Sequence, residues 1–444
     1  MSDENTQFGL SAATKNRLLA RLTRHPPAAV STGINGGHPR SVERSRRGIW
    51  DDLPGQRDIE MVARAAEKLG IPNLFFRSHE VRAGAQTAIG GREYLNFSSY
   101  DYLGLNGHPQ IAAAAMAAIE RFGTSVSASR MVSGERPVHR DLEQAMARFY
   151  GVEDALCFVS GHATNVTVIG HLLQAGDLIL HDQLIHNSVT QGAALSGARR
   201  HAFRHNDLDA ARRLLASHRR GHKHALLVIE GHYSMDGDIP DLPGFVDLAR
   251  EYDCWLMVDE AHAMGILGRC GRGIAEHYGI APTDVDIWMG TLSKALVSCG
   301  GYIAGSAKLI EFLKYSAPGF VYSVGMPASA AAAATTALEL LIEEPDRISR
   351  LNANAARFLS CIKQAGLDTG ASIGAAIVPV ITGSSIKAGR LSHALFERGI
   401  NIQPILYPAV PERSARLRFF LSAAHTEQQI DTAAALVAEE AARL

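Results

Sequence analysis

The middle of the chain alternates short, almost entirely apolar runs with longer segments in which apolar residues have a helical spacing. One helical segment is PGFVDLAREYD (243–253), which lies between two apolar runs. Strands that are apolar on both faces and alternate with helices are typical of a mainly parallel sheet covered by helices on both sides. The runs interpreted as strands are DALCFVS (154–160), DLILHD (177–182), HALLVIEG (224–231), CWLMVDEAH (254–262) and DIWMG (286–290).

The segments on either side of this region have different patterns. On the N-terminal side, QRDIEMVARAAEKLG (56–70) predicts an amphipathic helix that ends at Gly70, and QTAIGGREYLNF (86–97) predicts a hairpin with the two-residue turn Gly90-Gly91. On the C-terminal side, an alanine-rich helix begins after SVGMP. The remainder predicts a smaller α+β domain, with strands near AAIVPVIT (375–382) and RLRFFLSA (416–423).

The chain divides into four parts by composition and pattern. The first is rich in arginine, histidine, proline, glycine and serine and has no sustained apolar period. We therefore expect a mobile extension in which only 11–22, capped by Ser11, forms a short helix. The expected boundaries are 1–55 for the extension, 56–105 for a helix and strand segment, 106–326 for the large domain and 327–444 for the small domain.

Composition and charge exclude several classes of protein. Apolar residues make up 46% of the 444 residues and charged residues 20%, which is typical of a globular protein. The formal net charge of −1 gives no reason to expect nucleic acid or an anionic membrane as a partner, and no apolar run is long enough to span a bilayer. The N-terminus is polar, and the five cysteines are scattered without a CxxC pair. These features predict a cytoplasmic protein with no secretory signal, disulfide framework or zinc site.

Residues that can do chemistry gather where the predicted strands end. Ligands of mainly parallel sheets bind at the carboxyl ends of the strands, so these residues are expected to meet at one edge. Each of them alone fits ordinary capping or turn chemistry, but their number at one edge favours a site. They are Asp259, Glu260 and His262; Ser234; Asp182, His186 and Ser188; and Ser160, Gly161 and Asn165.

Two other interpretations of the sequence are less well supported. The DEAH tetrapeptide (259–262) suggests a nucleotide-driven helicase, but that class needs a GxxxxGK[ST] phosphate loop, and the chain has no Gly-Lys pair. The GxGxxG pattern of nicotinamide binding is also missing. The histidine-rich stretch 201–224 suggests a metal or nucleic-acid patch, but a solvated helix face is the simpler interpretation.

Lys294 stands among small residues in GTLSKALVSCGGY, directly after a predicted strand. In a buried pocket, desolvation lowers the proton affinity of the amine, and a neutral amine can attack a carbonyl and hold it as a Schiff base. Pyridoxal phosphate is the cofactor that uses such a lysine. It also needs a carboxylate at its ring nitrogen, a phosphate site and a flat side chain against its ring. For these three tasks the sequence offers Asp259, Gly161 with Thr291, and His186.

Eight motifs, taken in order from about Leu95 to the C-terminus, resemble those of one enzyme family. They are NFSSYDYLGL, SASRMVSGERPVHRDLE, SGHATN, DQLIHNS, EGHYSMDGD, MVDEAHAMGILGRCGRG, GTLSKALVSCGGY and RLRFFLSAAHT. The family is that of the α-oxoamine synthases, pyridoxal-phosphate enzymes of fold type I that include 8-amino-7-oxononanoate synthase, 2-amino-3-ketobutyrate CoA ligase, 5-aminolaevulinate synthase and serine palmitoyltransferase. The resemblance implies an α/β fold of the aspartate aminotransferase type. Its large domain has a mainly parallel sheet of the seven-stranded type, and its smaller C-terminal domain is α+β.

The resemblance also implies a role for each matching residue around the cofactor. Lys294 is similar to the lysine that forms the Schiff base, and Asp259 to the partner of the pyridine nitrogen. His262 and Ser234 match residues near the phenolic oxygen, and His186 matches the histidine that stacks on the ring. The backbone amides of Gly161 and His162 and the hydroxyl of Thr291 match the phosphate site.

On the substrate side, the resemblance assigns Arg418, the second arginine of RLR, to the amino-acid carboxylate, which suits a planar guanidinium. It also places Tyr100 and Ser129 near the substrate. The family often has Asn-Asp or Asn-Asn where Tyr100-Asp101 stands here. Serine palmitoyltransferases also have a tyrosine at this point, so the resemblance allows an amino acid larger than glycine, and glycine, alanine and serine all remain candidate substrates.

Family members are homodimers with the active site at the subunit interface, and the resemblance implies the same arrangement here. Val324 and Gly325 stand where many members have threonine and serine, which leaves Ser323 as the candidate hydroxyl for the phosphate in the neighbouring subunit. Ala128 stands where a glycine is common before SR.

The reaction implied by the resemblance is a decarboxylative condensation catalysed by an acyltransferase. The amino acid displaces Lys294 from the cofactor, Lys294 removes the Cα proton, and the carbanion attacks an acyl thioester. Loss of CO2 then gives an α-amino ketone and a free thiol, as in biotin-like, sphingoid-like or natural-product biosynthesis. Two alternatives stay open: another fold-type I reaction, such as transamination or retro-aldol cleavage, and a non-catalytic partner subunit. The segments RLR and SASRMVSG argue against the first, and Lys294 argues against the second.

The acyl donor is expected to be either acyl-CoA or an acyl group on a carrier protein. LSAATKNRLLARL (10–22) resembles the short linker helices at the front of polyketide and nonribosomal-peptide assembly-line proteins, which favours a carrier protein. A disordered tail with one transient helix is the simpler alternative. Carrier proteins are typically acidic, so basic residues of the extension are candidates for docking. They are Arg24, Arg40, Arg44, Arg46 and Arg47.

Overall fold

The computed structural model describes residues 50, 53–68 and 70–444. The short helix expected at 11–22 and nearly all of the extension 1–55 lie outside the described residues. Helix α2 (Gln56–Lys68) forms where the amphipathic pattern predicts it. The chain forms two compact units, Met1–Val62 and Ala63–Leu444. The four parts expected from the sequence stay a prediction.

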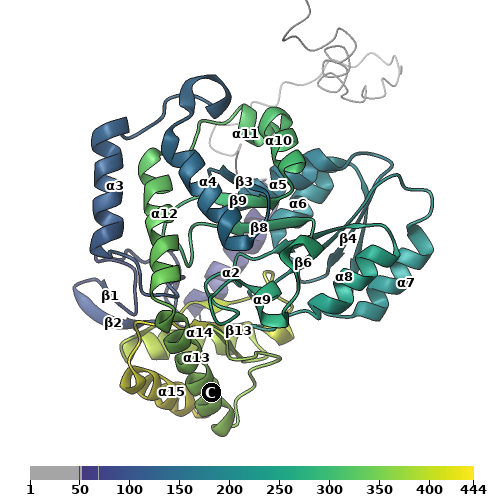
Figure 1. Cartoon of the computed structure of the whole chain (residues 1–444). Helices are drawn as coiled ribbons and strands as arrows, with labels where there is room; N and C mark the ends of the chain where they lie inside the picture. The colour runs from purple at the N-terminus through teal and green to yellow at the C-terminus, as the bar shows by residue number, and fades with distance from the viewer. Residues whose placement is uncertain (1–49, 51–52, 69) are drawn as a thin grey trace, which may run out of the picture. The chain divides into compact units, whose positions relative to one another are not determined.

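A seven-stranded sheet lies at the centre of the second unit (Figure 1). The strands from β8 to β5 in the order β3-β9-β8-β7-β6-β4-β5 run parallel to one another. Strand β9 runs antiparallel to both of its neighbours, β8 and β3. The mainly parallel sheet that the sequence predicts is therefore confirmed. The strands are β3 (Asp154–Phe158), β4 (Leu178–Asp182), β5 (Arg199–Phe203), β6 (Ala225–Glu230), β7 (Trp255–Asp259), β8 (Ile287–Thr291) and β9 (Gly301–Gly305).

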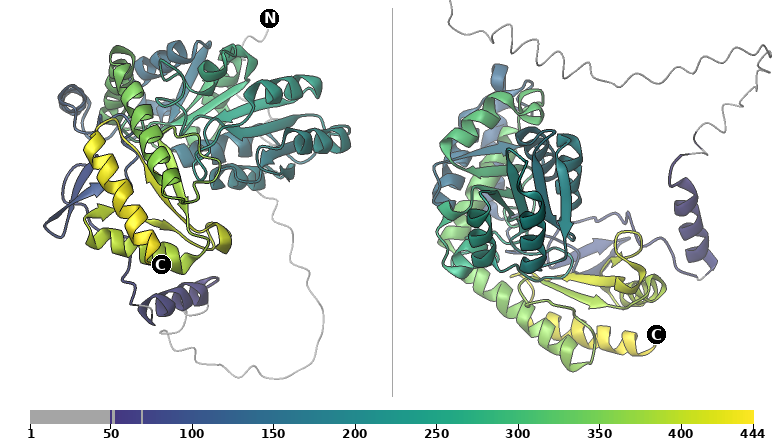
Figure 2. Two further views of the ribbon diagram at one scale, coloured as in Figure 1. Left: turned by 90° about the horizontal axis from the view of Figure 1, so that it is seen from below. Right: turned by 90° about the vertical axis from the view of Figure 1, so that its right-hand side faces the viewer.

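Helices pack on both faces of this sheet, which explains why its central strands are apolar throughout (Figure 2). In β7, Leu256 and Val258 pack into the core on one face, and Met257 packs into the core on the other. The first face is covered by α4 (Pro137–Tyr150), α7 (Leu208–His218), α8 (Leu242–Glu251), α9 (Ile274–Tyr278) and α12 (Ala328–Glu343). The second is covered by α5 (Gly161–Leu172), α6 (Asn187–Ser196), α10 (Ala307–Ser316) and α11 (Pro318–Val321).

Two strands of the large sheet are missing from the sequence-based prediction. Strand β5, RRHAF, lies at the sheet edge, and its residues are mostly polar and partly exposed. Strand β9, GYIAG, begins and ends with glycine and is fully buried. Neither strand contains an apolar run as long as the runs that identify β3, β6 and β7.

Two small sheets lie outside the central sheet. One is the antiparallel set β10 (Ile377–Ile381), β13 (Arg416–Phe420) and β12 (Pro404–Ile405), whose first two strands were predicted. The other combines the predicted hairpin, β1 (Gln86–Ile89) and β2 (Arg92–Asn96), with β11 (Ile400–Asn401).

The turn of the hairpin is Gly90-Gly91, as predicted, with Ile89 paired to Arg92. Both glycines have positive φ, +61° and +74°, as the favoured two-residue turn requires. Strand β2 pairs in parallel with β11, so main-chain hydrogen bonds join the hairpin to the C-terminal part of the chain.

The remaining elements connect and cover these sheets. They are α3 (Pro109–Phe122), the π-helical turn η2 (Arg130–Gly134), the 3₁₀ turns η3 (Pro282–Asp284) and η4 (Glu412–Ser414), α13 (Asp346–Gln364), α14 (Ser385–Glu397) and α15 (Glu427–Ala442). Within the described part of the chain, no helix is both long enough and apolar enough to cross a bilayer.

Candidate active site

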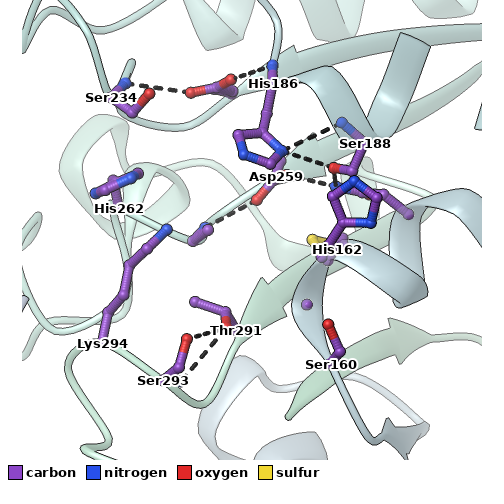
Figure 3. A pocket seen from close by; sticks show the side chains of 15 residues that line it. Ser160, His162, His186, Ser188, Ser234, Asp259, His262, Thr291, Ser293 and Lys294 are labelled. Carbon is purple, nitrogen blue, oxygen red and sulfur yellow. Dashed lines mark hydrogen bonds between the residues drawn. The ribbon is translucent and has the colours of Figure 1, made fainter. Parts of the chain in front are cut away.

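A cavity of about 250 Å³ lies at the carboxyl edge of the large sheet (Figure 3). It brings together eight of the nine residues that the sequence assigns to cofactor binding or catalysis. Figure 3 shows Lys294 and His262 on one side of it and His162 and His186 on the other. The lining residues are Ser160, Gly161, His162, Asn165, His186, Ser188, Glu230, Ser234, Asp259, Ala261, His262, Met289, Thr291, Ser293 and Lys294.

The amine of Lys294 has a lowered proton affinity. Burial lowers its pKa to about 8, although the negative charges of Asp259 and Glu230 act in the opposite direction. A larger fraction of this amine than of an exposed lysine is therefore neutral near neutral pH, and the neutral form is the one that a nucleophile or general base requires. Its Nζ lies 5.7 Å from the centre of the Tyr100 ring.

Asp259 and His186 are connected by a chain of hydrogen bonds. Asn165 Nδ2 donates to Asp259 Oδ2 (2.8 Å) and to Ser188 Oγ (2.9 Å). Ser188 Oγ in turn lies 2.7 Å from His186 Nδ1. The main-chain N–H of Ala261 donates to the other oxygen of Asp259 at 3.0 Å. The carboxylate of Asp259 is therefore held at both oxygens at the end of β7.

His186 presents a neutral ring with one defined proton. The main-chain N–H of Ser188 donates to His186 Nδ1 at 3.3 Å, so Nδ1 is an acceptor and the proton lies on Nε2. Burial lowers the pKa of His186, which favours the neutral form. A neutral, oriented imidazole suits stacking on an aromatic ring that carries its own positive charge.

The start of α5 provides a site for an anion. Ser160 caps the helix, and the first intrahelical bond is from Thr164 N to Ser160 O (2.9 Å). The N–H groups of Gly161 and His162 precede that bond, and such groups have no acceptor within a helix. A Cβ added at Gly161 would lie 2.9 Å from Thr291 Oγ1, so only glycine lets the helix approach Thr291 this closely. This combination of donors fits a phosphate group.

Comparison with known proteins agrees with this geometry. Residues 92–437 match the family described as aminotransferase class I and II. An 8-amino-7-oxononanoate synthase of Geobacter sulfurreducens is 42% identical over 369 residues, which cover 82% of this chain and 93% of that protein. Serine palmitoyltransferase of Sphingomonas wittichii superimposes with a TM-score of 0.83 at 29% identity, covering 88% of this chain and 98% of that one. Serine palmitoyltransferase of S. paucimobilis with bound PLP–myriocin aldimine superimposes with a TM-score of 0.84 at 28% identity, covering 88% and 99%.

This chain belongs to the α-oxoamine synthase family. The family, the fold-type I architecture and the dependence on pyridoxal phosphate that the sequence predicts are therefore confirmed. The N–H groups at the α5 N-terminus, the carboxylate of Asp259 and the amine of Lys294 fit the phosphate, the ring nitrogen and the aldehyde of this cofactor.

The phenol of Tyr102 orients His262 in this α-oxoamine synthase. Tyr102 Oη lies 2.7 Å from His262 Nδ1, and both side chains are buried. Burial, followed by the positive charges of Lys294 and Arg418, lowers the pKa of His262 well below its usual value. Because Tyr102 occupies Nδ1, Nε2 is the ring nitrogen that can serve a ligand. The sequence gives no role to Tyr102.

Glu230 is a second residue whose role the sequence does not predict. Its Oε1 accepts from the main-chain N–H of His186 (2.7 Å), and its Oε2 accepts from that of Ser234 (3.2 Å). The two dashed lines to these residues in Figure 3 mark the same bonds. One buried carboxylate thus connects the loop that carries His186 to the loop that carries Ser234. Its only sequence signal is that a charged residue ends the apolar run of β6.

Four predicted residues do not line the cavity. Arg418 Nη1 donates to Ser234 O (2.9 Å), and its Nε is buried and has no partner in the described part of the chain, so it can bind a carboxylate. Tyr100 packs edge-on against Phe420. Ser129 precedes the π-helical turn η2, and Ser323 Oγ bonds Val324 O beside a separate, smaller cavity. The roles of these residues stay predictions.

Proposed function

We propose that this α-oxoamine synthase joins the Cα of a small amino acid to the acyl group of a thioester at the Lys294 cavity, with loss of CO2. The products are an α-amino ketone and a free thiol. The observation that carries the proposal is the amine of Lys294, with a pKa of about 8, in the same cavity as the doubly held carboxylate of Asp259.

Pyridoxal phosphate, when bound, supplies a ring that accepts the electron pair left on Cα when its proton leaves. The chain's own residues supply the rest. The first N–H groups of α5 and the hydroxyl of Thr291 would hold the phosphate, Asp259 would serve the ring nitrogen, and His186 would pack on the ring. Lys294 removes the proton from Cα and later returns one. The free Nε of Arg418 binds the amino-acid carboxylate until it leaves as CO2.

For the substrates, we propose glycine, alanine or serine as the amino acid, because the ring of Tyr100 beside Lys294 restricts the space around Cα. The acyl group comes either from acyl-CoA or from an acidic acyl carrier protein that docks on the basic extension 1–55. A homodimer in the cytoplasm is the proposed working state, in keeping with the unpaired state of all five cysteines.

The experiment measures CO2 release that depends on the thioester. Each of the three amino acids is paired with matched acyl-CoA and acyl-carrier-protein donors, in wild-type protein and in Lys294→Ala. CO2 and free thiol in equal amounts are expected from the wild type only. A keto acid without CO2 would indicate transamination, and an aldehyde would indicate retro-aldol cleavage; either result would overturn the proposal.

The same assay on a protein that lacks residues 1–55 tests the donor. If a carrier protein is the donor, kcat/KM for the carrier-bound acyl group falls on truncation and falls with rising salt, while kcat/KM for acyl-CoA does not change. Equal use of both donors by both proteins would leave the N-terminal segment without a role in docking and make acyl-CoA the simpler assignment.

A further inference from the structure

His205 lies between two carboxylates, those of Asp182 and Asp238. Its Nδ1 is 2.9 Å from Asp182 Oδ1, and its Nε2 is 2.9 Å from Asp238 Oδ2. The side chains are 18%, 0% and 10% exposed, in the order His205, Asp182, Asp238. Carboxylates only accept hydrogen bonds, so both ring nitrogens donate and the ring is an imidazolium. These three residues are called the His205 cluster below.

The charge of His205 persists over the physiological pH range. Burial alone would lower the pKa of His205, but the hydrogen bonds to Asp182 and Asp238 outweigh it and raise the pKa to about 10. The sequence-based interpretation of 201–224 as a solvated helix face is therefore wrong at this position, because His205 precedes α7 and is paired on both sides. In the described part of the chain, no group of histidine, cysteine, aspartate and glutamate has the arrangement of a metal site.

The two carboxylates of the cluster belong to the loops that carry His186 and Ser234. Asp182 ends β4, and its Oδ1 also accepts from the N–H of Leu184 (2.7 Å), on the way to His186. Asp238 closes the loop of Ser234, since its main-chain oxygen accepts from Tyr233 N (2.9 Å).

The neighbouring residue joins the same two loops a second time. Asn206 N donates to Asp182 Oδ2 (2.8 Å), and Asn206 Nδ2 donates to Asp238 Oδ2 (2.7 Å). Glu230 bonds the same two loops from the cavity side, through His186 N and Ser234 N. Both loops are therefore held by two separate sets of hydrogen bonds, one from Glu230 and one from Asn206 and the His205 cluster.

The Ser234 loop also contacts the arginines of β13. Arg418 donates to Ser234 O, and Arg416 Nη1 bonds both Met235 O (3.0 Å) and Asp236 Oδ1 (2.7 Å). A change in the position of this loop therefore moves an acceptor of Arg418. The His205 cluster is therefore connected to Arg418 through the Ser234 loop, and to His186 through the loop that follows Asp182.

We propose that His205 is a positioning residue of the active site, which acts through Asp182 and Asp238 to hold His186 against the cofactor and Ser234 against Arg418. The inference rests on the proposed function in one respect, the role of Arg418 in binding the amino acid. It predicts that loss of the imidazolium affects the amino-acid site and the cofactor ring while leaving the thioester site nearly unchanged.

The test compares His205→Gln with His201→Gln in the full-length enzyme. His201 lies on β5 with its ring stacked on His218, outside the cluster, and is the matched control. Glutamine can serve one carboxylate at a time, and hydrogen bonds to charged groups are worth about 1.5–3 kcal/mol. We expect the KM for the amino acid to rise about tenfold in His205→Gln, with the KM for the thioester within about twofold of wild type. The intensity of the circular dichroism signal of the bound cofactor should also be lower in His205→Gln than in the wild type.

Hydrogen exchange in the same full-length proteins separates this proposal from the proposed function. Amides of 183–188 and 231–238 should exchange faster in His205→Gln, with or without cofactor, even if the enzyme proves to catalyse another reaction. Asp238→Asn, which keeps an acceptor but loses the charge, should give a smaller change in the same direction. A lower melting temperature in either variant, with unchanged exchange in these loops and an unchanged KM for the amino acid, would overturn the proposal.

Discussion

Glu230 and Asp259 are register partners on the adjacent parallel strands β6 and β7, and both line the Lys294 cavity. Burial, followed by the charge of Asp259, raises the pKa of Glu230 to about 8. Asp259 receives hydrogen bonds at both oxygens from Asn165 and Ala261, whereas Glu230 receives its hydrogen bonds from two loop amides. Two neighbouring carboxylates therefore have different surroundings: Glu230 holds the two loops, and Asp259 is the carboxylate that we propose for the cofactor ring nitrogen.

Replacement of Lys294 by alanine should abolish turnover and the absorbance band of lysine-bound cofactor. The reason is that Lys294 is the lysine that lines the cavity among the described residues. Lys308→Ala, at an exposed position of α10, is the control and should keep both. Spectra recorded before and after borohydride reduction check the prediction. A cofactor that is still fixed to the Lys294→Ala protein by borohydride would contradict it.

Asp259→Asn should leave the fold intact and weaken both cofactor binding and proton removal from Cα. An amide lacks the charge that keeps the cofactor ring nitrogen protonated, and its NH2 group would compete with the donors Asn165 and Ala261. We expect exchange of the Cα proton with solvent deuterium to fall at least about a hundredfold, the lower end for loss of acid–base assistance. Proton NMR of the amino acid, without thioester, measures this rate. A rate near that of the wild type would show that Asp259 is not the ring-nitrogen partner.

The rate at which cofactor-free protein captures pyridoxal phosphate should rise with pH around a midpoint near 8. The protonated amine of Lys294 cannot attack the aldehyde, and burial lowers its pKa to about 8, so the reactive form appears as pH rises through that value. In Glu230→Gln the midpoint should move to lower pH, because the charge of Glu230 raises the pKa of Lys294. Stopped-flow absorbance at a series of pH values gives both midpoints. A midpoint near the ordinary lysine value of about 10.4 would refute the desolvated amine.

Tyr100→Asn should change the choice of amino acid. The Tyr100 ring lies beside Lys294 and against Phe420, so a smaller side chain leaves more room next to Cα. The ratio of kcat/KM for serine to that for glycine should rise by about tenfold, the lower end for one small group in a pocket. Tyr278→Asn on α9, away from the cavity, is the control. An unchanged ratio in Tyr100→Asn would mean that this ring takes no part in selection.

The sequence predicts which residues meet at the Lys294 cavity because most of them belong to short motifs at the ends of strands. The five predicted strands are apolar on both faces, and their carboxyl ends meet at one edge of the sheet. A motif does not show which partner a side chain bonds when that partner is distant in the sequence. Asn165 bonds Asp259 over 94 residues of sequence, and Tyr102 bonds His262 over 160. The role of His205 is missed for the same reason, because Asp182 and Asp238 meet at its ring only when the chain folds. Strand β5 is missed because it lies at the sheet edge and its residues are mostly polar.

The pairing of β2 with β11 has a consequence for the order in which the protein is made. The buried side chains of Asn96 and Asn401 bond each other at 2.9 Å across 305 residues of sequence. At about 5–20 residues per second, the ribosome needs roughly 15–60 s to deliver β11 after β2. During that time the edge of β2 that later pairs with β11 is open, and an open strand edge is a template for pairing with other chains. Protection of this edge by a chaperone during synthesis would therefore favour a high yield of native enzyme.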